Sequence, residues 1–149
     1  MTRFDTEAAV ASRRVRFGLV IGCALVLLYG SVSDPSGSGL SRTGPLGAVG
    51  LDKWLHAAGY ATFALLIAYA LLPRWRSGPR GLIATLLLAG GYGLALELVQ
   101  GPLAYRSFDP HDATANLLGA FVVVLAVALF SRLRRWRSGW GRSTSGRER

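Results

Sequence analysis

The fold class of this chain is decided by residues 81–100, GLIATLLLAGGYGLALELVQ. This stretch contains one charged side chain, Glu97, and an α-helix needs about 20 consecutive, mostly apolar residues to cross the hydrocarbon core of a bilayer. It also lacks the polar face that a helix on the surface of a water-soluble bundle presents. Residues 81–100 are therefore predicted to form a transmembrane helix.

Three further stretches have the same character, residues 17–33, 54–73 and 113–131. Of the 149 residues, 51% are hydrophobic, and the mean hydropathy is +0.35, which is too apolar for a soluble fold of this size. Short links after the second and third stretches predict antiparallel neighbours. The sequence thus predicts an all-α, polytopic integral membrane protein, an up-down bundle of four transmembrane helices.

The first apolar stretch has a second interpretation. Arg13, Arg14 and Arg16 followed by an apolar run and by residues 31–33 (Ser-Val-Ser) are also typical of a secretory signal with its cleavage site. The uncharged run of 17 residues is long for the apolar core of a signal. We therefore expect this stretch to be a retained helix.

Sixteen arginines and one lysine against eight acidic residues give a formal net charge of +9. A basic chain raises the question of nucleic-acid binding. Here, however, the arginines flank the apolar stretches and do not line an aromatic surface. No nucleic-acid partner is expected, whereas a basic tail is suited to contact anionic membrane lipids.

The distribution of arginine predicts the topology. The N-terminal segment (1–16), the second link (74–80) and the tail (132–149) together contain 14 arginines. The first link (34–53) and the third link (101–112) contain only three basic residues, Arg42, Lys53 and Arg106. Because positive charge is retained on the cytoplasmic side, both termini are predicted to be cytoplasmic and these two links extracytoplasmic in a multi-pass protein of the cell membrane.

The cysteine content limits which sites the chain can form. Cys23 is the single cysteine and lies within an apolar stretch, so neither a disulfide within the chain nor a cysteine-based metal site is expected. We expect Cys23 to act as a small buried hydrophobic side chain.

Polar residues that a membrane helix normally avoids gather at the end of the bundle opposite the arginine-rich segments. They are Asp52, Lys53, His56, Glu97, Gln100, Arg106, Asp109, His111, Asp112 and Asn116. Three groups each share a helix face by their spacing: Asp52, His56 and Tyr60; Glu97 and Gln100; Asp112 and Asn116. An ionisable group inside a transmembrane segment costs several kcal/mol unless it finds a partner, so it indicates function by default. Glu97 and Asn116, each about one turn inside an apolar stretch, are the first candidates.

Several of these residues also have structural interpretations. Asp109 before Pro110 is preferred as the N-cap of the fourth helix, Asp52 is suited to cap the second, and the helix dipole favours Asp112 in a first turn. Lys53 and Arg106 are suited to reach toward lipid headgroups as interfacial anchors.

The same polar residues are compatible with a metal site or with a structural network. His56, Asp52, Glu97, Asp112 and His111 supply the nitrogen and oxygen ligands of a hard or borderline metal. Their spacing matches no strict metal motif. A hydrogen-bonded network that joins three helices is preferred, so no metal site is predicted and the sequence identifies no cofactor.

At these residues the chain resembles the VanZ-like family of membrane proteins. The matching elements, in order, are Asp52-Lys53-Trp54-Leu55-His56 for D-K-x-x-H, Tyr60, Glu97-Leu98-Val99-Gln100 for E-x-x-Q, Arg106-Ser107 for R-S, and Asp112, Asn116 and Gly119 for D-x-x-x-N-x-x-G. The resemblance covers residues 52–123, and Val123 stands where a second glycine is expected. The family's namesake is linked to low-level resistance to the glycopeptide teicoplanin, and no settled biochemical activity attaches to the family as a whole.

Three functions remain open from the sequence. The first is an enzyme in which Glu97, Asp112 or His56 acts as acid or base. In it, the residues that bind an anionic lipid or a lipid-linked envelope precursor are Asp52, Lys53, Gln100, Arg106 and Asn116. The second is a non-catalytic protein that binds a lipid, an envelope precursor or a glycopeptide-like molecule. The third is a transporter or transporter subunit, for which no broken helix or inverted repeat is evident.

Overall fold

A computed structural model describes residues 11–34, 43–45, 47, 49–75 and 78–143, with the side chains of 72–75 and 138–143 left out. Its helices are α1 (Arg13–Val32), α2 (Leu51–Trp75), α3 (Pro79–Gln100) and α4 (Pro110–Ser143). In these residues the only β pairing is an isolated bridge between Thr43 and Gly50. Parts of the predicted N-terminal segment, first link and tail (1–10, 35–42 and 144–149) lie outside the described residues.

The helix starts follow from local sequence. The Ser12 hydroxyl accepts a hydrogen bond from the Val15 amide at the start of α1 (3.4 Å). Asp109 Oδ1 accepts a hydrogen bond from the His111 amide (2.8 Å), and Pro110 occupies the first position of α4, where its missing N–H has no cost. The prediction that Asp109 caps this helix is therefore confirmed.

The helices are longer than the apolar stretches that predicted them. α2 begins at Leu51, so Asp52 and Lys53 lie in its first turn, although the first link was predicted to extend through residue 53. α4 continues beyond residue 131 to Ser143 because the basic segment that follows contains no proline to stop it.

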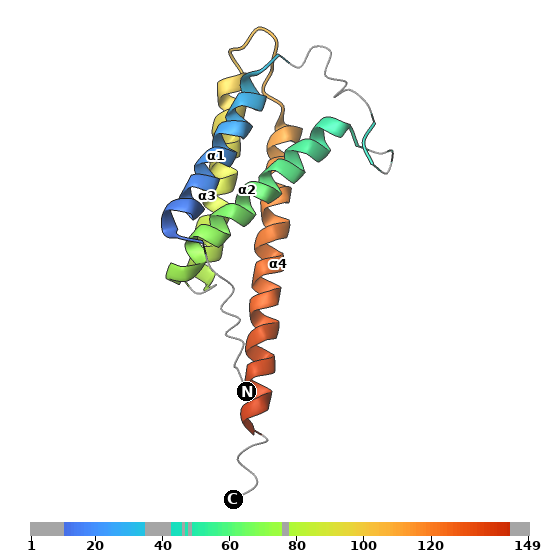
Figure 1. The fold of residues 1–149 in the computed structure, drawn as a ribbon. Coiled ribbons are helices and arrows are strands. Elements are labelled where there is room, and N and C mark those ends of the chain that lie inside the picture. Colours follow the sequence, from blue (N-terminus) through green and yellow to red (C-terminus); the bar gives the residue numbers. More distant parts are fainter. Residues whose placement is uncertain (1–10, 35–42, 46, 48, 76–77, 144–149) are drawn as a thin grey trace, which may run out of the picture.

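Figure 1 shows α2 at the centre of the arrangement, in contact with the other three helices. α4 packs on α2 and α3, whereas α1 packs on α2 and α3 from the other side, and α1 and α4 do not meet within the described residues. The crossing of α4 over α2 is close at Gly119, where an added Cβ would overlap the backbone of Ala57. Glycine is required there because no side chain fits between the two backbones.

The distribution of polarity is inverted relative to a water-soluble protein. The largest fully buried side chains are Glu97, Asn116 and Thr85, whereas large apolar side chains such as Leu87 (68% exposed) and Leu98 (64% exposed) face outward. Contiguous exposed apolar surface of this kind suits a lipid environment. All four helices are long and apolar enough to cross a membrane. The chain is thus an all-helical, multi-pass membrane protein, as the sequence predicts.

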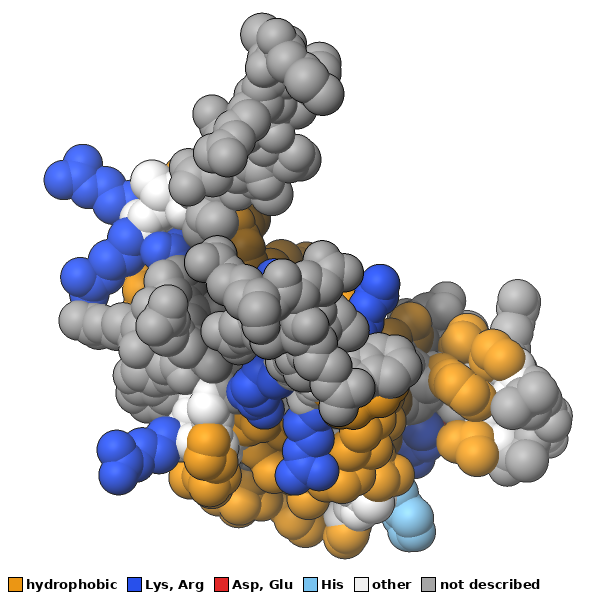
Figure 2. Space-filling view, turned by 90° about the horizontal axis from the view of Figure 1, so that it is seen from below, with side chains coloured by type: hydrophobic (Ala, Val, Ile, Leu, Met, Phe, Trp, Pro, Cys, Tyr) orange, Lys and Arg blue, Asp and Glu red, His pale blue; other side chains and the backbone are white. Residues whose placement is uncertain are grey.

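The two ends of the bundle differ in charge. Exposed arginines lie at the end formed by the start of α1, the start of α3 and the last part of α4: Arg13, Arg14, Arg80, Arg132, Arg134, Arg135 and Arg137. Figure 2 looks onto this end and shows several blue basic side chains next to orange hydrophobic ones. The start of α2, the end of α3 and the start of α4 meet at the opposite end, and they position the polar site.

Candidate functional site

Lys53 is the centre of an ion-pair cluster at the outer edge of the site. Its ammonium lies 2.8 Å from Asp52 Oδ2, 2.6 Å from Asp109 Oδ2 and 2.5 Å from Asp112 Oδ1. The contact with Asp112 is a short ion pair to a carboxylate oxygen that is buried. Lys53 thereby joins α2 to the third link and α4, and its charge is already matched by three carboxylates.

Asp109 lies outside the membrane-spanning segments and takes part in both the helix cap and this cluster. The hydrogen bond from the Lys53 ammonium, followed by that from the His111 amide, holds the pKa of Asp109 well below its usual range. The sequence identified only the capping role, because nothing in local spacing indicates an ion pair between residues that are 56 positions apart.

A second set of contacts connects α2, α4 and α3 through Asn116. Its Oδ1 lies 2.9 Å from His56 Nδ1, and its Nδ2 donates to Glu97 Oε1 at 3.5 Å, a long contact. Because the amide nitrogen faces the carboxylate, the amide oxygen faces the imidazole, and His56 Nδ1 must donate to it. Asn116 therefore orients both His56 and Glu97.

The other imidazole nitrogen faces a second carboxylate. His56 Nε2 lies 3.5 Å from Asp112 Oδ2. With Nδ1 donating to Asn116, Nε2 of a neutral imidazole carries a lone pair that points at a carboxylate oxygen. Two acceptors at this distance require a positive charge between them, supplied by a proton or by a cation.

Burial increases from the edge of the site inward. The side chains of Asp52 and Asp109 are 34% and 32% exposed, and that of Asp112 is 16% exposed. Glu97 is 1% exposed, and its Oε2 has no hydrogen-bond partner in the described structure. Buried polar atoms are almost always paired, so an unpaired carboxylate oxygen at the base of a polar site indicates an interaction with something else.

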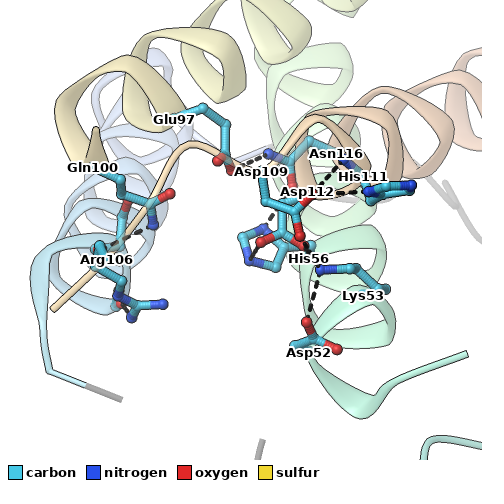
Figure 3. A network of polar contacts seen from close by, with 12 residues as sticks. Asp52, Lys53, His56, Glu97, Gln100, Arg106, Asp109, His111, Asp112 and Asn116 are labelled. Carbon is cyan, nitrogen blue, oxygen red and sulfur yellow. Dashed lines mark hydrogen bonds and ion pairs between the residues drawn. The ribbon is translucent and has the colours of Figure 1, made fainter. Parts of the chain in front are cut away.

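Gln100 and Arg106 lie apart from this cluster. Gln100 Nε2 donates to the carbonyl of Ser31 (3.0 Å), and the Arg106 guanidinium donates to the carbonyls of Gly30 and Ser33 (2.8 Å each). Figure 3 shows both side chains next to α1, on the far side of Glu97 from Lys53 and His56. They satisfy carbonyls at the C-terminus of α1, which have no partner within the helix.

Seven of the polar residues singled out in the sequence therefore meet at one place: Asp52, Lys53, His56, Glu97, Asp109, Asp112 and Asn116. His111 contacts Asp109 from an exposed position, with 86% of its side chain accessible. Sequence reasoning did not identify Gly93 as part of the site, where an added Cβ would come within 3.2 Å of both Tyr60 and Asn116. A glycine among other glycines of α3 gave no specific signal.

Comparison of the chain with protein-family models, with curated proteins and with solved structures gives no match. The chemistry of the site therefore rests on its own residues. Glu97, His56 and Asp112 together can accept, hold and release a proton, and their ligand atoms lie within 4.8 Å of one another.

Proposed function

We propose that this chain is a VanZ-like protein of the cell envelope whose polar site binds and chemically modifies the head group of an anionic membrane lipid or a lipid-linked envelope precursor. The observation that carries the proposal is the buried Glu97 carboxylate, which has one unpartnered oxygen and lies beside His56 and Asp112. Intramembrane ionisable groups are costly and are retained where they act on protons, ions or substrates.

The catalytic part of the proposal uses these three side chains. Glu97, in the least polar surroundings, accepts or donates a proton. Asp112 and Asn116 contact the two nitrogens of His56 and hold the ring in one orientation. An imidazole held between a carboxylate and an amide is suited to exchange a proton with a bound head group.

The location of the site supports a membrane-embedded substrate. Lys53, His56 and Asp112 are partly exposed at the end of an apolar bundle, where the polar head group of a lipid would lie while its chains follow the outward-facing apolar side chains. The proposed orientation places this end on the extracytoplasmic side, because the exposed arginines lie at the other end. Labelling of single cysteines in a Cys23→Ser background tests it: a membrane-impermeant maleimide should react in intact cells at Ser107→Cys and not at Ser12→Cys, and the reverse pattern excludes the orientation.

Profiling of lipids and envelope precursors by mass spectrometry tests the function in cells. Cells with the gene deleted, restored, and restored as Glu97→Gln are compared, with Thr85→Val, a buried residue of the same helix, as the control. A species that accumulates in the deletion and with Glu97→Gln, but not with Thr85→Val, supports an enzyme. Lipid and precursor profiles that are the same in all strains contradict an enzymatic function.

A second candidate is a non-catalytic binding protein, as the link of the VanZ-like namesake to teicoplanin resistance would also allow. The observation in its favour is that Lys53 and three carboxylates already form a closed set of ion pairs across α2 and α4. In that case, sensitivity to envelope-directed compounds changes on deletion of the gene, while lipid and precursor profiles stay the same.

A further inference from the structure

Three side chains from three helices converge on one point at the base of the site. His56 of α2, Glu97 of α3 and Asp112 of α4 each offer one ligand atom, and these atoms all lie within 4.8 Å of one another. Figure 3 shows these three side chains close together, with the Glu97 carboxylate directed toward the Asn116 amide. One nitrogen and two oxygen ligands on separate, packed helices form the kind of site that helical bundles build for metals.

The protonation pattern leaves metal-binding atoms free. His56 Nδ1 donates to Asn116 Oδ1, which fixes the tautomer and leaves the Nε2 lone pair available. Asp112 uses Oδ1 for Lys53, so its Oδ2 faces His56 Nε2. Glu97 uses Oε1 for Asn116, and its buried Oε2 has no partner. Each of the three side chains thus has one contact that orients it and one ligand atom left over.

The charge of the site also favours a cation. The carboxylates of Asp52, Asp109 and Asp112 surround the single ammonium of Lys53, and Glu97 adds a fourth carboxylate beside Asp112 and His56. Arg106, which would offset this excess, donates to carbonyls of α1 instead. A bound cation would offset the excess negative charge of this cluster.

We propose that His56 Nε2, Glu97 Oε2 and Asp112 Oδ2 bind one divalent transition-metal ion, with Asn116 as the positioning residue for two of the three ligands. Imidazole and carboxylate ligands suit zinc and manganese, whereas calcium and magnesium prefer oxygen ligands alone. Metal–ligand bonds of about 2.1 Å place tetrahedral ligand atoms about 3.4 Å apart. Because the ligand atoms here lie within 4.8 Å of one another, side-chain rotations must bring the widest pair closer by up to about 1.4 Å.

Three protein ligands leave at least one coordination position for another group, as in catalytic zinc sites. A head-group phosphate or carboxylate oxygen is the type of ligand that would take it. This role of the ion rests on the proposed function, whereas the binding of the ion does not.

Zinc binding to the purified full-length chain tests the proposal. The protein is prepared in lipid nanodiscs through a tag without histidine, freed of metal with a chelator, and titrated with Zn²⁺ in excess Mg²⁺. The expected stoichiometry is about one zinc per chain. His56→Gln and Glu97→Gln should raise the Kd for zinc by at least about 100-fold, and Asn116→Ala by about 10- to 100-fold. Equal binding by His56→Gln and the unmodified protein would overturn the site.

The variant His111→Gln serves as a control, and it also allows a test in which the three proposed ligands are unchanged. The chain has two histidines, so in His111→Gln the only imidazole is that of His56. This variant should bind zinc like the unmodified protein, because His111 lies outside the site and is exposed. With Mn²⁺ bound, pulsed electron paramagnetic resonance of His111→Gln should show coupling to one imidazole nitrogen. Bound manganese without that coupling would overturn the proposal even if His56→Gln failed to fold.

The outcomes for the ion and for the proposed function are separable. Zinc bound at His56, with lipid profiles unaffected by Glu97→Gln in cells, supports the metal site and contradicts the proposed function. Lipid conversion that continues at the same rate in metal-free protein contradicts a role of the ion and leaves the proposed function in place.

Discussion

Replacement of Glu97 by leucine separates a functional carboxylate from a structural one. Glu97 is 1% exposed, its Oε2 has no hydrogen-bond partner among the described residues, and its Oε1 receives a long contact of 3.5 Å from Asn116. A carboxylate held this weakly in an apolar bundle contributes little to the folded state. Metal-free protein with Glu97→Leu is therefore expected to be more stable than the unmodified chain, and inactive.

The size of the expected stability change can be estimated from the two residues of the Glu97–Asn116 contact. An unsatisfied polar atom in a buried position costs about 1–3 kcal/mol, and a buried charge costs more. Leucine removes both costs but leaves Asn116 Nδ2 without its acceptor, and this loss destabilises the folded state by about 1–2 kcal/mol. The expected net gain is about 1 kcal/mol, or a rise in Tm of roughly 2–4 °C for a chain of this size.

Thermal unfolding in one detergent, after treatment with a chelator, measures the change. Thr85→Val is the matched control in the same helix, because the Thr85 hydroxyl is equally buried but already donates to the Gly81 carbonyl at 2.9 Å. Its Tm is expected to change by less than about 2 °C. A lower Tm for Glu97→Leu, or normal lipid profiles in cells that carry it, would refute the assignment of Glu97 to a functional site.

Three further predictions follow from the packing and charge of the site. Gly119→Ala places a Cβ against the backbone of Ala57 and should lower the free energy of unfolding by about 1–3 kcal/mol, measured by thermal unfolding. Gly91→Ala is the control and should not lower it, because nothing lies within 4 Å of an added Cβ there. Equal effects of the two substitutions would contradict the close crossing of α4 and α2. The pKa of Asp109 is lowered in the folded state, so its contribution to stability is present above the unfolded pKa of about 4 and is lost as pH falls through the folded pKa. Asp109→Asn should accordingly flatten the dependence of Tm on pH below about pH 4, and an unchanged slope would argue against the Lys53 pair. Arg106→Ala should increase hydrogen exchange at the end of α1, because it frees the carbonyls of Gly30 and Ser33, and unchanged exchange there would favour the headgroup role expected from the sequence.

The sequence predicts the fold and the end of the bundle that carries the site, because both depend on local properties. Four apolar stretches of membrane length predict four helices, and the structure confirms them. The Asp109-Pro110 pair marks the start of α4 through a cap that involves neighbouring residues only. Residue types that are costly in lipid are sparse, so their clustering near three helix ends was visible without any tertiary information.

The partners within the site could not be predicted, because they depend on how helices face one another. Glu97 and Gln100 share a face by their spacing, yet three residues turn a helix by about 300°, which leaves the two side chains about 60° apart. That offset directs Glu97 toward Asn116 of α4 and Gln100 toward Ser31 of α1.

The positions of glycines in the sequence likewise do not predict where the helices approach most closely. Glycines 18, 22, 90, 91 and 93 are small enough to allow close helix approach, yet nothing lies within 4 Å of an added Cβ at Gly18, Gly22 or Gly91. The tightest approach between helices is at Gly119, which the resemblance to the VanZ-like motif includes but which its local sequence does not distinguish.

The central claim, that Glu97, His56 and Asp112 act chemically on a membrane lipid or lipid-linked precursor, is tested most directly by reconstitution. The purified chain in nanodiscs is incubated with the lipid extract of cells that lack the gene, and the mixture is followed by mass spectrometry. We predict that the unmodified protein and Thr85→Val consume one lipid species and form a product of different mass, while Glu97→Gln does neither. Binding of that lipid without any change in mass, to the same extent in all three proteins, would contradict the claim.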